Sequence, residues 1–368
     1  MERNLERRAD LPSLTALRGF AACAVLLAHA HFFLGPDPPT EVLSQGGRCG
    51  VGFFFVLSGA ILAYNYSGEF SNRRFLLKRF ARIYPVYLLA FGIGLVARAA
   101  VDHGIGFLSP ELVLKNLLMV PGWFADGNSQ TVPATAWTLS CELLFYLLFP
   151  LVLPLLRRIP ARAAGVAIAV LVLASFAGPG LLYEHVIDTA FYLSPVVYLP
   201  LFVLGCLIGL HLPRMVSDPQ GFLRRNSRGL LVGSAVGVVA AWAGMTLLPE
   251  WPDLFVFVWP VLIAAGAAAD VNGPHWLSSR WLIYGGLWSY AFYSVHAPLI
   301  NIVTGVLNDP PPIAVGVPIG IAMFAGIWAV SALIFRFWEE PCRERITKRR
   351  PKEVAVLGDT KPAVSEPA

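Results

Sequence analysis

Long apolar runs recur along this sequence, and they constrain its fold more than any other feature. About ten of them reach roughly 17 to 25 residues, the length that a helix needs to cross a lipid bilayer. They begin near Leu14, Cys49, Arg79, Thr135, Arg162, Tyr192, Gly229, Leu254, Trp281 and Ile313. Only 14% of the residues are charged and the mean hydropathy is +0.63, whereas about a quarter of a soluble domain is charged. The sequence therefore predicts an all-α, polytopic membrane protein with about ten transmembrane helices.

The distribution of basic residues predicts how these helices are oriented, because Lys and Arg collect in cytoplasmic loops. With a cytoplasmic N-terminus and about ten spans, only Arg48, Arg98 and Lys115 of the 28 lysines and arginines fall outside. We therefore expect both termini in the cytoplasm. The net charge of +5 then reflects this bias and attraction to anionic membrane lipid, so no nucleic-acid partner is expected.

The chain divides into three expected segments. Residues 1–13 form a cytoplasmic N-terminal segment, residues 14–338 the transmembrane domain, and residues 339–368 a cytoplasmic, disordered tail that is basic and then Pro-rich. Glu339 and Glu340 can pair with Arg336, Arg343 or Arg345. The five cysteines are scattered and have no metal-ligand spacing, so no metal site is predicted.

The first apolar run, Leu14 to His31, keeps an arginine, Arg18, near one end and a histidine, His29, near the other. Such residues are costly in a bilayer and are therefore functional candidates. On one continuous helix they lie about 16 Å apart along the axis and within roughly 20° of the same face. In the alternative interpretation, Arg18 snorkels to the interface and His29 forms a hydrogen bond between helices.

Two further motifs are a pair of arginines on the predicted cytoplasmic side and a serine in a segment of small residues. Arg79 and Arg82 are three residues apart, so they share one helical face at a depth similar to that of Arg18. They can clamp a phosphate, or they can be an ordinary basic flank. Ser58 lies in the glycine-rich segment GVGFFFVLSG, which favours close helix packing or a local helix break.

Two more ionisable residues fall inside later apolar runs. Glu142 lies at a predicted depth close to that of His29, and a carboxylate at this depth needs a partner, for which an arginine is the structural alternative. His296 shares one helix face with Ser289 and Tyr293. It is either catalytic or a histidine that is hydrogen-bonded within the bundle.

These motifs, in this order, resemble the acyltransferase-3 family of membrane O-acyltransferases, bacterial members of which modify surface polysaccharides, lipopolysaccharide and some macrolides. The resemblance covers Leu11 to about Arg345. The segments that carry it are Arg18 with His29, GVGFFFVLSG at residues 50–59, the Arg79/Arg82 pair followed by Ile83 and Pro85, WTLSCELLFY at residues 137–146 and YAFYSVHAPL at residues 290–299.

The resemblance implies acyl-CoA, most often acetyl-CoA, as a co-substrate that enters from the cytoplasm. Its phosphates would meet Arg18, Arg79 and Arg82. His29 is then the expected general base for an acceptor hydroxyl, because imidazole changes protonation near neutral pH, and Glu142 could orient it. An acyl-His29 intermediate is the alternative. Backbone N–H groups around Ser58 are possible oxyanion donors.

The resemblance also implies the setting of the reaction: a bacterial plasma membrane, with a glycan, glycolipid or macrolide-like molecule as acceptor. No esterase-like domain follows the last predicted helix, so a separate extracytoplasmic partner is a further expectation. A glycan or lipid transporter or flippase is the competing function. Such proteins often contain inverted repeats, whereas here the charged motifs lie in the first four helices and have no counterpart in the second half.

Overall fold

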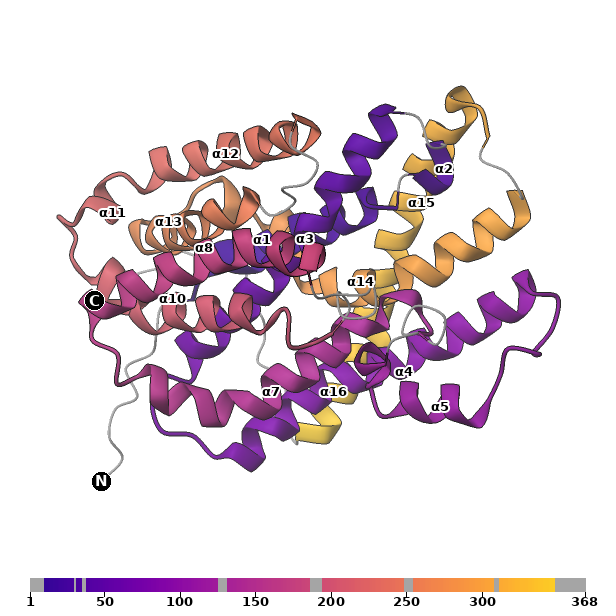
Figure 1. Cartoon of the computed structure of the whole chain (residues 1–368), viewed down its shortest axis with the longest axis horizontal. Helices are drawn as coiled ribbons and strands as arrows, with labels where there is room; N and C mark the ends of the chain where they lie inside the picture. Colours follow the sequence, from indigo (N-terminus) through magenta and orange to yellow (C-terminus); the bar gives the residue numbers. More distant parts are fainter. Residues whose placement is uncertain are drawn as a thin grey trace, which may run out of the picture.

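The computed structural model of the protein describes residues 10–29, 31–34, 38–124, 131–185, 194–247, 254–307 and 311–347. Helices are the only regular secondary structure in these ranges, which confirms the predicted all-α fold. In chain order they are α1 (Pro12–Leu27), α2 (His31–Leu34), α3 (Pro38–Asn65), α4 (Asn72–Val101), α5 (Pro110–Leu117), η1 (Pro121–Trp123), η2 (Ala134–Ala136), α7 (Trp137–Leu156), α8 (Ala161–His185), α10 (Leu199–Ser217), α11 (Phe222–Arg225), α12 (Ser227–Leu247), η3 (Leu254–Phe257), α13 (Trp259–Asn272), η4 (Trp276–Ser278), α14 (Arg280–Leu307), α15 (Ile313–Ile334), η5 (Phe335–Glu339) and α16 (Glu340–Thr347). Figure 1 shows α1 and α3 near the centre, with α12 and α13 on one side and α4 and α5 on the other.

Seven helical segments in the described ranges are long and apolar enough to cross a membrane. They are Asn72–Val101, Ala134–Leu156, Leu199–Ser217, Ser227–Gly244, Leu254–Asn272, Arg280–Leu307 and Ile313–Thr347. Three shorter apolar helical segments are Pro12–Leu27, Cys49–Asn65 and Ala161–Phe176. The membrane character is thus supported, whereas the count of about ten spans and the cytoplasmic termini stay predictions.

The predicted terminal segments are described only in part. Residues 1–9 and 348–368 lie outside the described residues. The chain is helical from residue 339 to Thr347, within the segment that the sequence assigns to a disordered tail.

The first helix is shorter than its apolar run predicts. Helix α1 ends at Leu27, and the backbone N–H of His29 donates to the carbonyl oxygen of Leu26 at 2.9 Å, as part of a turn. The hydroxyl of Ser44 in α3 donates to the carbonyl oxygen of Ala28 at 2.8 Å, which satisfies a carbonyl that a longer helix would have used. Arg18 therefore lies on α1, and His29 lies in the turn that follows it.

Glycine allows α1 to pack closely against α14. A Cβ atom added to Gly286 would overlap the carbonyl oxygen of Thr15 in α1. Helices α3 and α10 approach in the same way at Gly205, where an added Cβ would overlap the carbonyl oxygen of Val56. Small residues of this kind bring helix backbones together inside membranes.

The substitution Gly286→Ala tests the contact between α1 and α14. We expect it to lower the free energy of unfolding by about 1–3 kcal/mol, because the added methyl group must push the two backbones apart. Denaturation of the purified protein in detergent measures the change. The matched control is Gly233→Ala on α12, where an added Cβ meets open space and helix propensity favours alanine. Equal destabilisation by both variants would contradict the packing argument.

A buried cluster holds the N-terminus of α1. The Asp270 carboxylate accepts hydrogen bonds from the backbone N–H of Ser13 at 3.0 Å and from its hydroxyl at 2.7 Å. His275 Nε2 lies 2.9 Å from Asp270 Oδ1 and 3.1 Å from Ser13 Oγ. In a catalytic triad the serine and the aspartate contact opposite ring nitrogens, whereas here both contact Nε2. The cluster is therefore a cap that fixes the helix carrying Arg18.

Candidate functional site

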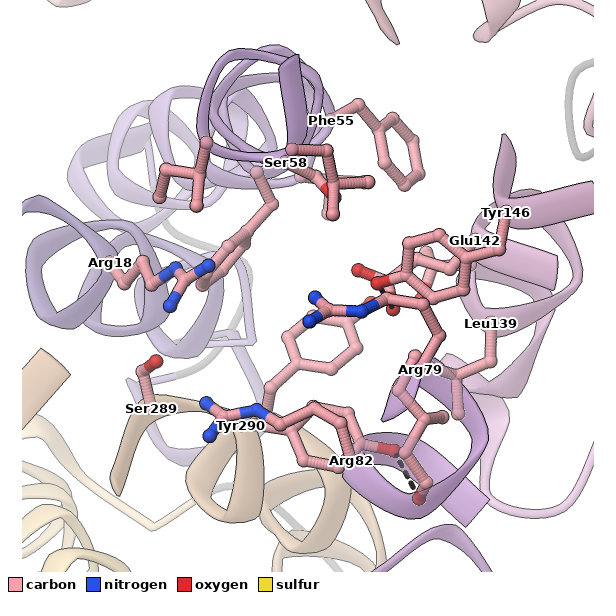
Figure 2. Close-up of a pocket in the computed structure, with 17 residues that line it drawn as sticks. Arg18, Phe55, Ser58, Arg79, Arg82, Leu139, Glu142, Tyr146, Ser289 and Tyr290 are labelled. Atoms are coloured by element: carbon pink, nitrogen blue, oxygen red, sulfur yellow. Dashed lines mark hydrogen bonds between the residues drawn. The ribbon is translucent and has the colours of Figure 1, made fainter. Parts of the chain in front are cut away.

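Side chains from α1, α3, α4, α7 and α14 surround a cavity of about 90 Å³ (Figure 2). Five of the seven predicted site residues line it: Arg18, Ser58, Arg79, Arg82 and Glu142. In Figure 2 the guanidinium groups of the three arginines point into the same space, with Glu142 and Tyr146 on the opposite side from Arg18. The structure thus brings together residues that are far apart in the sequence.

The Arg79/Arg82 pair lies on one face of α4, as its spacing predicts. Arg82 is held from the other end of the chain, because its Nη1 lies 3.1 Å from Oε1 of Glu339. Glu339 is only 1% exposed. Because water is excluded there, the Glu339 carboxylate and the Arg82 guanidinium need each other's opposite charge. The orientation of Arg82 in the cavity therefore depends on the C-terminal helices.

The partner of Glu339 differs from the prediction. Glu340 does pair with Arg343 at 2.5 Å, but Glu339 faces α4. The cause is the π-helix η5, whose wider turn changes the direction of the side chains that follow. Trp338 in the same turn donates its indole N–H to the carbonyl oxygen of Pro85 in α4 at 2.7 Å, which fixes this arrangement.

Arg79 presents an unsatisfied donor. Its Nε is buried and has no hydrogen-bond partner in the described part of the chain. Its guanidinium carbon lies 6.0 Å from the centre of the Tyr66 ring and 5.9 Å from that of Phe75, so aromatic faces support it on the apolar side. Among the described residues, neither Arg79 nor Arg18 forms an ion pair. Because buried donors are normally paired, this cavity suits an anionic ligand.

Glu142 has different neighbours from those predicted. Its Oε2 accepts a hydrogen bond from the hydroxyl of Tyr146, one turn along α7, at 3.2 Å, and its side chain lines the cavity of the three arginines. His29 does not line that cavity. The orientation of the His29 imidazole by Glu142 stays a prediction. The three arginines that line the cavity with Glu142 supply the opposite charges that a carboxylate at membrane depth needs.

The two remaining predicted residues, His29 and His296, contact each other. Their ring centres are 5.1 Å apart. His29 Nδ1 lies 2.9 Å from the carbonyl oxygen of Val25, and His296 Nδ1 lies 2.7 Å from that of Tyr293. Because a carbonyl oxygen only accepts, each Nδ1 carries the hydrogen and each neutral ring keeps its lone pair on Nε2. His296 is fully buried, whereas His29 is partly exposed.

Tyr293 connects the cavity with the histidine pair. It lines the cavity together with Thr138 and Ser289, and its ring centre lies 5.5 Å from that of His296. The shared face of Ser289, Tyr293 and His296 was visible in the sequence, although only the first two reach the cavity. Thr138 was not predicted from the sequence; the signal for it was its position one turn before Glu142.

The chain matches the family described as an acyltransferase domain (Acyl_transf_3) over residues 11–332. The acyltransferase MdmB of Streptomyces mycarofaciens is 34% identical over 95% of this chain and 96% of its own length. The exopolysaccharide production protein ExoZ of Rhizobium meliloti is 28% identical over 83% of the chain and 92% of its own length. The peptidoglycan O-acetyltransferase OatA of Listeria monocytogenes is 26% identical over 92% of the chain but only 56% of OatA. No solved structure is significantly similar.

Proposed function

We propose that this chain moves an acyl group, most often an acetyl group, from acyl-CoA to a hydroxyl group. The proposal starts from the family: the chain belongs to the acyltransferase-3 family and is an acyltransferase. The proposed acceptor is a cell-surface glycan, a glycolipid or a related secondary metabolite. We also propose a multi-pass location in a bacterial plasma membrane, with both termini in the cytoplasm. A separate extracytoplasmic partner belongs to the same proposal.

The cavity of three arginines is the observation that supports an acyl-CoA donor. Arg18 and Arg79 share the cavity with Glu142 but form no ion pair in the described ranges, and Arg79 Nε is buried without an acceptor. CoA carries phosphate groups, and guanidinium groups bind phosphate through parallel, charge-assisted hydrogen bonds. The acyl end of the donor would then extend along the cavity toward Tyr293 and the histidine pair.

His29 is the proposed general base. Its Nε2 would take the proton of the acceptor hydroxyl while the hydroxyl oxygen attacks the thioester carbonyl carbon. The carbon–sulfur bond then breaks, and the CoA thiolate takes the proton back from His29. The partial exposure of His29 favours this role over His296, which is fully buried. His296 would position the imidazole of His29, and backbone N–H groups near Ser58 would stabilise the oxyanion.

The acceptor class is supported by the names of relatives. ExoZ is named an exopolysaccharide production protein, and OatA a peptidoglycan O-acetyltransferase. Both names concern polymers that contain sugars, whose hydroxyl groups are weak nucleophiles until a base takes the proton. With a cytoplasmic N-terminus, His29 at the far end of the first apolar run would lie toward the exterior, where it would serve such an acceptor.

The test uses membrane vesicles that contain the full chain and acetyl-CoA radiolabelled in its acetyl group. We expect label in the glycan or lipid fraction, in an ester that mild base releases, together with free CoA. Vesicles without the protein are the control. If label enters neither fraction and no CoA is released, the acyltransfer proposal fails. Movement of a labelled glycolipid across these vesicles would then indicate a transporter.

A further inference from the structure

One of the residues that line the cavity is a tyrosine that is hydrogen-bonded across two helices. The hydroxyl of Tyr293 in α14 lies 2.7 Å from Oγ1 of Thr138 in α7. Thr138 Oγ1 donates its own hydrogen to the carbonyl oxygen of Thr135 at 2.9 Å. The Tyr293 hydroxyl must therefore be the donor to Thr138, and this bond holds the tyrosine in one orientation.

The ring of Tyr293 is also held by aromatic contacts. Its centre lies 5.8 Å from that of Phe54 and 5.5 Å from that of His296. Phe54 lines the cavity with Tyr293, whereas His296 and His29 do not. The Tyr293 ring thus lines the cavity of the arginines and also contacts the histidine pair through His296. Only 8% of Tyr293 is exposed, so its ring is largely packed against protein.

We propose that Tyr293, braced by Thr138, limits the acyl group of the donor to the size of acetyl. The inference rests on the proposed function, because it takes the CoA phosphates to bind Arg18, Arg79 and Arg82. With that end fixed, the acyl group points toward Tyr293. Each added methylene would then have to displace a ring that is held by one hydrogen bond and two ring contacts.

Binding of an acyl-CoA series tests this limit without an acceptor. Isothermal titration calorimetry of the purified full chain gives Kd for acetyl-, butyryl- and hexanoyl-CoA. For the wild type we expect hexanoyl-CoA to bind at least about 10-fold more weakly than acetyl-CoA, the scale of discrimination that a steric pocket achieves. In Tyr293→Ala we expect the two donors to bind within about threefold of each other. Thr138→Val keeps the side-chain shape but removes the hydrogen bond, and we expect an intermediate ratio.

The matched control is Tyr284→Ala. Tyr284 lies on the same helix and stacks on Trp288 at 5.7 Å, outside the cavity, so its loss leaves the wild-type order of donors. Tyr293→Leu replaces the alanine variant if that variant does not fold. The inference is overturned if the wild type binds hexanoyl-CoA as well as acetyl-CoA, or if removal of the Tyr293 ring leaves the order unchanged. Failure of the wild type to bind any of the three donors would instead reject the proposed function.

Discussion

His29→Ala is expected to reduce acyl transfer by about 10²–10⁴-fold, the contribution of a general base. The acceptor hydroxyl loses the group that takes its proton, while the cavity of Arg18, Arg79 and Arg82 stays intact. Transfer of radiolabelled acetyl groups in membrane vesicles measures the loss. Calorimetric titration with acetyl-CoA should give a Kd close to the wild-type value, which separates a missing base from a collapsed site.

The controls for this prediction come from other histidines and from a near-isosteric change. His29→Gln keeps most of the side-chain volume without a basic ring nitrogen, so it should be as inactive as His29→Ala. His103→Asn changes an exposed histidine in a loop with a φ of 52°, a conformation that asparagine tolerates, and should retain activity. Full activity of His29→Ala together with inactivity of His296→Ala would assign the base to His296.

Much of the cavity was predictable because its residues are ionisable and lie in apolar runs. Arg18, Arg79 and Arg82 carry charges at similar depths, and the cost of burial makes such residues converge on a common site. Glu142 was predictable as a paired carboxylate for the same reason. The sequence left two kinds of partner open for Glu142, His29 and an arginine, because depth along a helix does not determine the rotation of that helix.

Other contacts depend on local deviations that hydrophobic periodicity does not report. Helix α1 ends at Leu27, and just beyond this end the hydroxyl of Ser44 in α3 donates a hydrogen bond to the carbonyl oxygen of Ala28. The pairing of Glu339 with Arg82 depends on the π-helix of η5. Both features arise from contacts between distant segments, so a pattern within one segment could not predict them.

Arg79→Met is expected to raise the KM for acetyl-CoA by about 10- to 100-fold, because a charge-assisted hydrogen bond contributes about 1.5–3 kcal/mol. Methionine keeps an apolar stem against Tyr66 and Phe75, so the packing loss is small. Arg82 is the less informative position, because its removal would leave Glu339 buried without its counter-charge. Initial rates of CoA release over a range of acetyl-CoA concentrations measure the effect. Arg74→Met, at an exposed position near the start of α4, is the matched control.

A donor without phosphates identifies what Arg79 binds. Acetylpantetheine has the same thioester and the same pantetheine arm as acetyl-CoA but no phosphate. If Arg79 binds phosphate, the wild type and Arg79→Met should use acetylpantetheine equally well, because the lost interaction is absent from both reactions. An equal penalty with both donors would mean that Arg79 acts on the acyl group, the acceptor or the fold. The comparison therefore tests the electrostatic basis of donor binding independently of the base at His29.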